Sequence, residues 1–400
     1  MNRMSPAAKP AVPSPAVADP LLEWRREFPT VEATLHLASH TLGAMPRGVV
    51  EALSRYAQAW STRGIRAWEE GWFALPTEVG NLIAGLLHGE AGSVSMHENV
   101  TVAQAVALSA VNFTPPRNRL VCGAEDFPSV LYLYEGLARR GVEVVRVAAR
   151  DGRTLEEDDV LAAIDERTAL VAVSQVMFRT AQLLDIGAIA RRARAAGALT
   201  MIDAYQAVGT LPVDVAALGI DFLTGGSVKW LCGGPGAGYL YAGPRAARLE
   251  PALTGWMAHA RPFDFDSGPM IWHDGPRRFW TGTPGIPSYI AARPGYEIVA
   301  AIGVTAIREK SVRQTARLIA WADEFGFRVG SPRAVERRGG TVVLDVPNAA
   351  SVCEALLRRD VLCDHRPGVG LRLAPHFYTR DDEVDEVMKR VREETARAAR

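Results

Sequence analysis

The sequence predicts an α/β protein, with a mostly parallel sheet covered by helices in a large domain and a smaller α+β domain after it. Three observations predict this fold class. Between residues 118 and 204, short apolar runs rich in β-branched residues alternate with segments of helical periodicity. After Gly282 the alternation gives way to a long helical stretch and separated strands. A chain of 400 residues with 48% hydrophobic composition is also large enough for a big core and a smaller one.

The large domain is predicted over residues 64–285, and its elements follow one another regularly. Strands are expected at residues 119–124, 142–149, 168–176 and 198–204, with two more at Phe222–Leu223 and 238–243. Helices are expected at residues 128–141, 155–165 and 185–197. In such a sheet, ligands bind at the carboxyl ends of the strands.

The small domain is predicted over residues 286–400. Its elements are expected at residues 287–325 (a long helical stretch), 340–346 (strand), 350–358 (helix), 370–375 (strand) and from Asp381 onward (helix). Residues 21–63 have no obvious place in the large sheet and are expected to pack with this domain. Residues 1–20 are rich in proline and alanine and are predicted to form a flexible tail.

Charge and composition argue against several classes of partner. The formal net charge is zero and the pI is about 7.1, so we expect no binding to nucleic acid or to an anionic membrane. No apolar run has membrane-spanning length, and the N-terminus lacks the continuous apolar core of a signal peptide. The four cysteines form no CxxC pair, which predicts no structural metal and favours a reducing, cytoplasmic location.

One lysine stands out in the stretch DFLTGGSVKWLCGGPGAGYLY. Only Lys9, Lys229, Lys310 and Lys389 are lysines among the 45 basic residues, and Lys229 lies between a strand-like run and a glycine-rich turn. A lysine amine can lose its proton and attack a carbonyl, which a guanidinium cannot do. A surface lysine whose ammonium group reaches solvent is the alternative.

Asp203 ends the strand at 198–204, at the edge where a ligand binds. An acid and an amine at neighbouring strand ends suit pyridoxal 5′-phosphate (PLP), which needs a lysine for its Schiff base and an acid to keep its pyridine nitrogen protonated. A turn or helix cap is the alternative role for Asp203. The pair therefore predicts a PLP enzyme with a small amino-acid substrate.

Two further groups complete the predicted site. The segment HENVTVAQAVALSAV predicts a helix whose start, at Asn99, Val100 and Thr101, offers a place for the phosphate. Phe127 follows the strand at 119–124 and is expected to cover the pyridine ring; an ordinary core residue is the alternative. The run GGPGAG leads into a strand instead of opening a helix, which excludes a dinucleotide fingerprint and hence NAD.

From about Leu21 onward, the chain resembles the kynureninases of the class V aminotransferase family. The resemblance lies in ordered segments that include SHTLGAMPR, GIRAWEEGW, EDFPSVLYLYEGLA, IDAYQAVGTLPVDVAALGIDFLTGGSVKWLCGGPGAGYLY, RFWTGTPGIPS and RPGVGLRLAPHFYTR. It implies a fold-type I PLP-dependent transferase architecture, with a seven-stranded type of sheet in the large domain. It also implies a homodimer with shared active sites.

The resemblance implies roles for individual residues. Lys229 forms the Schiff base, Asp203 is the partner of the pyridine nitrogen, and Phe127 stacks on the ring. Trp256 and Thr283 belong to the phosphate site of the neighbouring subunit. Arg372, in GLRLAP, holds the substrate α-carboxylate, a bidentate task suited to arginine, although the chain has many arginines.

Several positions depart from the kynureninase pattern. The family tyrosine before the lysine, which binds phosphate and acts as an acid during Cβ–Cγ cleavage, is Val228 here. The family histidine is Gln206, which we keep among the cofactor-binding residues. Tyr378 is expected near the substrate, and either Tyr378 or a water is the expected substitute proton donor. The remaining departures are Val130, Met177, Phe178 and Ala181.

The sequence thus predicts a PLP-dependent enzyme that binds an amino acid as an external aldimine and cleaves a bond at Cβ, as a hydrolase or lyase. The missing tyrosine predicts a substrate other than kynurenine. A class V aminotransferase and a true kynureninase are the alternative enzymes. A relative that keeps the fold only for binding is less favoured, because Lys229, Asp203, Phe127 and Arg372 are all retained.

Overall fold

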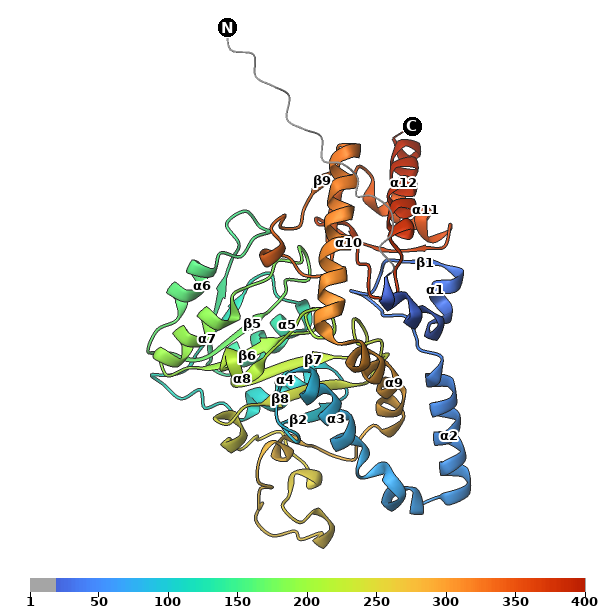
Figure 1. Ribbon diagram of the computed structural model, residues 1–400. Helices are drawn as coiled ribbons and strands as arrows, with labels where there is room; N and C mark the ends of the chain where they lie inside the picture. The colour runs from blue at the N-terminus through green and yellow to red at the C-terminus, as the bar shows by residue number, and fades with distance from the viewer. Residues whose placement is uncertain (1–18, 400) are drawn as a thin grey trace.

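The computed structural model describes residues 19–399, which form two main sheets and the helices around them (Figure 1). The predicted tail at 1–20 lies almost wholly outside the described residues. Its last two residues are placed: Asp19 accepts a hydrogen bond from the backbone of Leu21, and Pro20 begins the first helical turns.

The larger sheet has seven strands in the order β2-β8-β7-β6-β5-β3-β4. Their bounds are β2 Val94–His97, β3 Arg119–Gly123, β4 Glu143–Val147, β5 Thr168–Ser174, β6 Leu199–Asp203, β7 Phe222–Gly226 and β8 Gly238–Ala242. β8 is antiparallel to both neighbours and the other pairs are parallel. The predicted α/β class with a mostly parallel sheet is confirmed, and each strand expected between residues 119 and 204 contains the observed one.

Helices cover both faces of this sheet. Their bounds are α3 Leu75–Leu86, α4 Val100–Ser109, α5 Pro128–Ala138, α6 Glu157–Ala163, α7 Ile186–Ala195 and α8 Val215–Leu218. Successive residues of a strand face opposite sides, so Leu120 and Leu170 pack in one core with α4 and α5. Val121 and Val171 pack in the other core with α6 and α7. Burial on both faces explains the continuous apolar runs of these strands.

A second, antiparallel sheet has four strands in the order β12-β13-β10-β9. Their bounds are β9 Arg328–Val329, β10 Val342–Asp345, β12 Asp364–Arg366 and β13 Gly370–Leu373. Helices α11 Ala349–Leu357 and α12 Asp381–Ala398 share a core with it. β10, α11, β13 and α12 match the elements expected at the C-terminal end of the chain, whereas β9 and β12 were not expected. The boundaries of the two domains, at 64–285 and 286–400, stay predictions.

The long helical stretch expected at 287–325 consists of two helices. α9 Ile286–Ile302 and α10 Val304–Phe325 meet at an angle of 83°. Gly303, between them, has a φ of 84°, a conformation that ends a right-handed helix and favours glycine. Within residues 19–399, no single helix is long and apolar enough to cross a membrane, and this bent pair meets that test only when its two helices are counted together.

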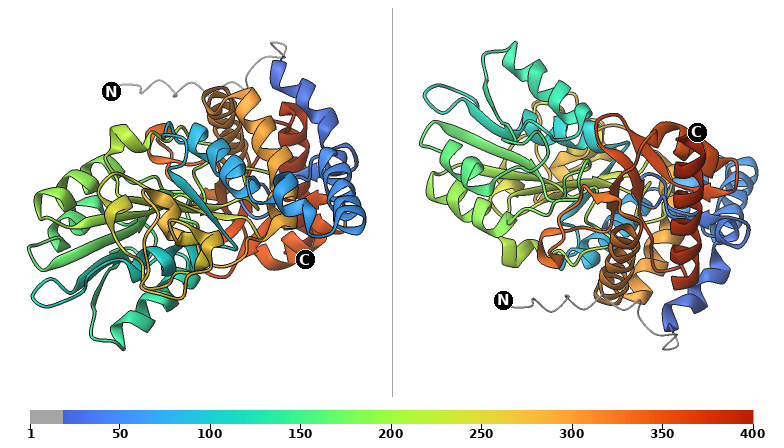
Figure 2. Two further views of the ribbon diagram at one scale, coloured as in Figure 1. Left: turned by 90° about the horizontal axis from the view of Figure 1, so that it is seen from below. Right: turned by 90° about the horizontal axis from the view of Figure 1, so that it is seen from above.

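The N-terminal segment lies beside the second sheet in both views of Figure 2. It contains η1 Pro20–Glu27, α1 Pro29–Ala33, β1 Leu35–His36 and α2 Gly48–Arg63, and β1 pairs in parallel with β11 Val361–Leu362. Between β1 and α2 the chain reaches the larger sheet, where the N–H of Gly43 donates a 2.8 Å hydrogen bond to the carbonyl of Val228. This contact brings the turn at 39–44 to the residue beside Lys229.

The remaining helical turns are short. They are η2 Trp68–Trp72, η3 Ala246–Arg248, η4 Trp256–Ala258, η5 Pro262–Asp264, η6 Pro276–Phe279 and η7 Val335–Arg337. The segment between β8 and α9 projects from the larger sheet at the bottom of Figure 1. It carries both residues that were predicted to act in a neighbouring subunit, Trp256 and Thr283.

Candidate active site

The carboxyl edge of the larger sheet holds a cavity of about 550 Å³. The residues predicted for the site that line it are Asn99, Val100, Thr101, Phe127, Asp203, Gln206 and Lys229. Residues far apart in the sequence meet here because parallel strands end at the same edge of a sheet.

Lys229 follows β7, and its amine lies close to two aromatic rings. Nζ is 4.5 Å from the centre of the Tyr205 ring and 5.7 Å from that of Phe127. Burial lowers the pKa of Lys229 to about 8, while the charge of Asp203 opposes this shift and that of Arg372 adds to it. A large share of this lysine is therefore a neutral amine at mildly alkaline pH, the form that attacks a carbonyl.

Asp203 ends β6 with a buried carboxylate. Its Oδ1 accepts a 2.9 Å hydrogen bond from the backbone N–H of Tyr205. Burial raises the pKa of Asp203, whereas that hydrogen bond and the charge of Lys229 lower it. A buried carboxylate in this setting is suited to pair with a protonated ring nitrogen.

Helix α4 presents its N-terminus to the same cavity. Asn99 caps the helix: its side chain accepts a 3.1 Å hydrogen bond from the N–H of Val102, and its carbonyl accepts one of 3.0 Å from Ala103. The N–H groups of Val100 and Thr101 donate no hydrogen bond to any group in the described part of the chain. Free N–H groups at a helix N-terminus are a place for an anion such as phosphate.

Phe127 lines the cavity with a side chain that is 39% exposed, which is high for a core phenylalanine. The preceding residue, Asp126, is buried and ties two strand ends together. Its carboxylate accepts hydrogen bonds of 2.9 Å from the N–H of Gly123 and 3.0 Å from that of Ser174. Burial raises the pKa of Asp126 to about 7, although these hydrogen bonds act to lower it. Asp126 thus fixes the backbone that carries Phe127.

Gln206 lines the cavity, but most of the hydrogen-bonding capacity of its amide is used within the protein. Nε2 donates a 3.0 Å hydrogen bond to the carbonyl of His40, and Oε1 accepts one of 3.0 Å from Nε1 of Trp230. One N–H of the amide is left for other contacts. A direct contact between Gln206 and a cofactor stays a prediction.

Arg372 lies next to the cavity wall, where its Nη1 donates a 2.6 Å hydrogen bond to the carbonyl of Phe178. Its Nε and Nη2 each lie 2.6 Å from an oxygen of Asp364, and Nε2 of His40 lies 3.1 Å from the same carboxylate. Burial alone would raise the pKa of Asp364, but the hydrogen bonds from His40 and Arg372 hold it well below its ordinary range. Three of the five N–H donors of the guanidinium are used, which leaves two for a ligand.

Trp256 and Thr283 lie outside this cavity. Trp256 stacks on Phe265 with ring centres 5.8 Å apart, and Thr283 is exposed. Their place on the projecting segment agrees with a role in another subunit, which stays a prediction.

Tyr378 is buried away from the cavity, which corrects the expectation that it contacts the substrate. Its hydroxyl lies 2.8 Å from Oγ of Ser39 and 3.3 Å from the N–H of Ala44. The turn at 39–44 covers Tyr378, and its residues form the hydrogen bonds of the Tyr378 hydroxyl. Tyr378 therefore holds this turn in place and does not supply a proton in the cavity.

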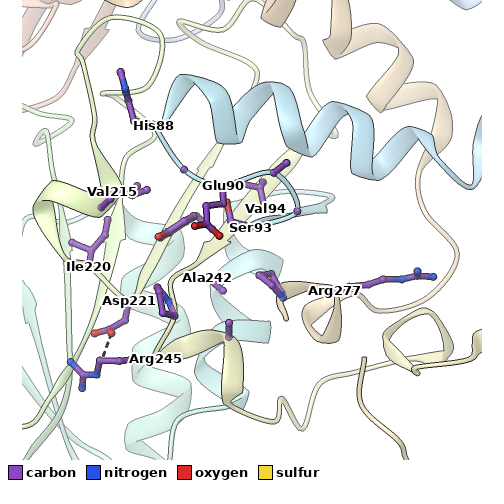
Figure 3. Close-up of a pocket in the computed structure, with 18 of the residues that line it drawn as sticks. His88, Glu90, Ser93, Val94, Val215, Ile220, Asp221, Ala242, Arg245 and Arg277 are labelled. Carbon is purple, nitrogen blue, oxygen red and sulfur yellow. Dashed lines mark ion pairs between the residues drawn. The ribbon is translucent and has the colours of Figure 1, made fainter. Parts of the chain in front are cut away.

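A larger cavity, of about 810 Å³, lies at the opposite edge of the sheet (Figure 3). It is lined by residues at the start of β2 and β7 and the end of β8, among them Val94, Asp221 and Ala242. Its labelled ion pair joins Arg245 to Asp221 at 3.5 Å. None of the predicted site residues lines it, so the smaller cavity is the candidate active site.

Four residues of the site were missed at the level of sequence: Tyr205, Asp126, His40 and Asp364. Asp126 and Tyr205 each lie one or two residues from a predicted site residue, so strand-end position alone could have found them. The pairing of His40 and Asp364 depends on the contact between the N-terminal segment and the second sheet, for which the sequence carries no local signal.

Known proteins resemble this chain over most of its length. The family described as aminotransferase class-V matches residues 40–359. The kynureninase of Bacillus thuringiensis subsp. konkukian is 31% identical over 384 residues, covering 92% of this chain and 89% of that protein. The kynureninase of Deinococcus radiodurans is 32% identical over 361 residues, covering 87% and 86%.

Solved structures share the fold at lower identity. An apo cysteine desulfurase from Thermococcus onnurineus NA1 matches with a TM-score of 0.82 and 21% identity, covering 94% of this chain and 98% of that one. The cystine C-S lyase C-DES, in complex with cysteine persulfide, matches with a TM-score of 0.82 and 17% identity, covering 92% and 99%. The fold is therefore that of fold-type I PLP enzymes. The chain is a kynureninase-like member of the class V aminotransferase family, with PLP as its cofactor.

Proposed function

We propose that this enzyme cleaves a bond at Cβ of a small amino acid, as a hydrolase or lyase. The observation that carries the proposal is the meeting of Lys229, with a pKa of about 8, and the buried Asp203 in one cavity. PLP supplies an electron sink when it is bound, which makes the Cα proton of an amino acid acidic. Lys229 is the base that takes this proton, because a lysine with a lowered pKa is neutral often enough to accept it.

The residues of the cavity fit this cofactor. Asp203 is suited to hold the pyridine nitrogen protonated, and Phe127 to cover one face of the ring. The free N–H groups of Val100 and Thr101 are suited to the phosphate. A cavity of about 550 Å³ has room for both the cofactor and a small substrate.

Arg372 is proposed to bind the substrate α-carboxylate with its two remaining N–H donors. Asp364 holds two other donors of the guanidinium and fixes its plane. Bidentate recognition of a carboxylate needs such a fixed plane. The negative charge of Asp364 also selects against a second carboxylate at this place.

The substrate side chain is proposed to differ from that of kynurenine. Valine at position 228 cannot donate a proton, and an acid beside the reacting atoms contributes typically ~10²- to 10⁴-fold in rate. The cavity walls are also rich in apolar side chains, namely Val100, Val102, Val176, Phe178 and Val228. Kynurenine hydrolysis is the second candidate, favoured by the 31% identity to a kynureninase over 92% of this chain.

A substrate screen tests the proposal. The PLP-loaded protein is offered a panel of amino acids, with mass analysis of the products, beside steady-state assays on kynurenine and 3-hydroxykynurenine. We expect Cβ cleavage of another amino acid, and faster kynurenine hydrolysis by Val228→Tyr than by the wild type. A wild type that hydrolyses kynurenine at ~10⁴ M⁻¹s⁻¹ or better, with no gain from Val228→Tyr, would establish the second candidate. A keto acid that keeps the whole carbon skeleton of the substrate, formed without release of ammonia or of a side-chain fragment, would establish an aminotransferase.

We also propose a cytoplasmic homodimer with composite active sites. The projecting segment carries Phe263 and Phe265, which are 51% and 75% exposed, and α2 is followed by Ile65 at 85%. Exposed apolar groups of this size are typical of a surface that another subunit covers.

A further inference from the structure

Tyr205 places its hydroxyl at a gap left by a glycine. A Cβ added to Gly226 would lie 2.5 Å from the Tyr205 hydroxyl and 2.6 Å from its Cζ. Any larger residue at position 226 would therefore displace this ring. The ring itself faces Lys229, whose Nζ is 4.5 Å from its centre.

The pairing of β7 with β8 relates this hydroxyl to the N-terminus of α4, which lines the same cavity. Gly226 of β7 stands directly opposite Gly238 of β8, and paired residues of antiparallel strands project toward the same face. A Cβ on Gly238 would lie 2.6 Å from the backbone of Asn99. The hydroxyl of Tyr205 and the start of α4 therefore each lie beside one of two positions that are about one strand spacing, ~4.8 Å, apart on one face of the sheet.

This separation suits a phosphate. A phosphate oxygen accepts hydrogen bonds of ~2.7–2.9 Å, so one phosphate group can reach donors on both sides of such a gap. The N–H groups of Val100 and Thr101 are free on one side, as described above. Tyr205 lines the cavity on the other side. Burial raises the pKa of Tyr205 to about 12, so at neutral pH the phenol keeps the proton that it would donate.

We propose that Tyr205 donates a hydrogen bond to the phosphate of the cofactor and so replaces the tyrosine that is absent at position 228. This inference rests on the PLP assignment and not on the reaction proposed above. Tyr205, Gly226 and Val228 then act together. Gly226 leaves room for the phenol ring of Tyr205, and Val228, which is smaller than the family tyrosine, leaves room for the Tyr205 hydroxyl to reach the phosphate. With valine in place of the family tyrosine at position 228, the site then lacks that acid but still has a tyrosine hydroxyl for the phosphate.

The test compares PLP with pyridoxal, which lacks the phosphate. Apo protein is titrated with each compound, and affinity is read from tryptophan fluorescence and from the absorbance of the protein-bound compound. Tyr205→Phe removes only the hydroxyl. We expect it to weaken PLP binding ~10- to 100-fold, as for a lost hydrogen bond to a charged group, and to leave pyridoxal binding unchanged.

Two further variants and a control sharpen the test. Tyr205→Phe with Val228→Tyr should recover the preference for PLP, because a phenol returns to the phosphate. Gly226→Ala should lose it, because the added Cβ displaces the Tyr205 ring. The control is Tyr239→Phe: the hydroxyl of Tyr239 lies next to Gly225, one residue along β7, but is fully buried outside the cavity.

The outcomes separate the possibilities. An unchanged preference in Tyr205→Phe overturns the proposal, and so does an equal loss for both compounds, which would indicate a packing role for the ring. Thermal unfolding of each apo variant reports on folding; Tyr205→Phe keeps the ring, so its fold is the least disturbed. A wild type that binds neither compound would overturn the cofactor assignment itself, a result distinct from failure of the role of Tyr205.

Discussion

Arg372 of β13 stands directly opposite Asp364 of β12, and the two side chains are joined by two hydrogen bonds of 2.6 Å. Both side chains are largely buried, at 3% and 13% exposure. A guanidinium held in this way cannot turn freely, and its remaining donors keep one direction. The cross-strand pair therefore fixes the direction of the group that we propose to bind the substrate carboxylate.

Asp364→Asn should lower both stability and substrate affinity. The change leaves the Arg372 guanidinium buried without an anion, at a cost of about 3 kcal/mol in the free energy of unfolding. The freed guanidinium should also raise KM for the amino acid more than it lowers kcat. Urea denaturation and steady-state kinetics measure these effects. The control is Asp382→Asn, whose pair with Arg380 is exposed and should matter little; equal effects in both variants would contradict the prediction.

Borohydride reduction should attach PLP to Lys229 alone. Lys310, which is fully buried, has its Nζ 2.8 Å from the Asp19 carboxylate and bonded to the carbonyl of Phe377, and these contacts keep its amine from attacking a carbonyl carbon. Peptide mapping after reduction identifies the modified residue. Lys229→Ala should lose the label and Lys310→Met should keep it. A label on Lys310 in the wild type would refute the assignment.

Cofactor uptake by the apo protein should accelerate as pH rises through about 8. Only the neutral amine attacks the aldehyde, and burial places the pKa of Lys229 at about 8, below its ordinary 10.5. The positive charge of Arg372 contributes to this lowering, so Arg372→Gln should move the midpoint of the rate profile to higher pH. Stopped-flow absorbance gives the midpoint. The exposed Arg150→Gln is the control, and a midpoint near 10.5 in the wild type would show that Lys229 is not desolvated.

Mixed dimers should recover activity from two inactive variants. If Thr283 serves the neighbouring site, a Lys229→Ala protomer paired with a Thr283→Ala protomer contains one site with both residues intact. Up to about half of the wild-type activity per mixed dimer is expected on this geometry. Activity is measured after subunit exchange has been verified with differently tagged protomers. Exchange without recovery would mean that each site is built from one chain.

The sequence was sufficient for residues whose role depends on local position. Lys229, Asp203 and Phe127 follow strand ends, and parallel strands bring such positions together whatever the details of packing. Asn99 was also found from its local position, because a capping residue such as asparagine indicates the start of a helix. The strand β2 was not expected, because its four residues are too few to show a clear alternation of apolar and polar side chains.

Residues that depend on the path of distant segments could not be predicted. The burial of Tyr378 depends on the turn at 39–44, which crosses from the second sheet to the larger one. The direction of the Tyr205 ring depends on the empty space at Gly226, and a single sequence does not reveal which way a side chain after a strand end will turn. The 83° bend depends on the positive φ of Gly303, a backbone conformation that helical periodicity does not reveal.

The close approach of Tyr205 to Gly226 also constrains the order in which this site could arise. With the ring in its present place, residue 226 has no room for a Cβ. An ancestor with a larger residue there could gain glycine first without a clash, but could not gain the tyrosine first and keep this ring position. A pair of changes at these positions therefore avoids the clash only if glycine comes before the tyrosine, and a reversal avoids it only if the tyrosine is removed before residue 226 becomes larger.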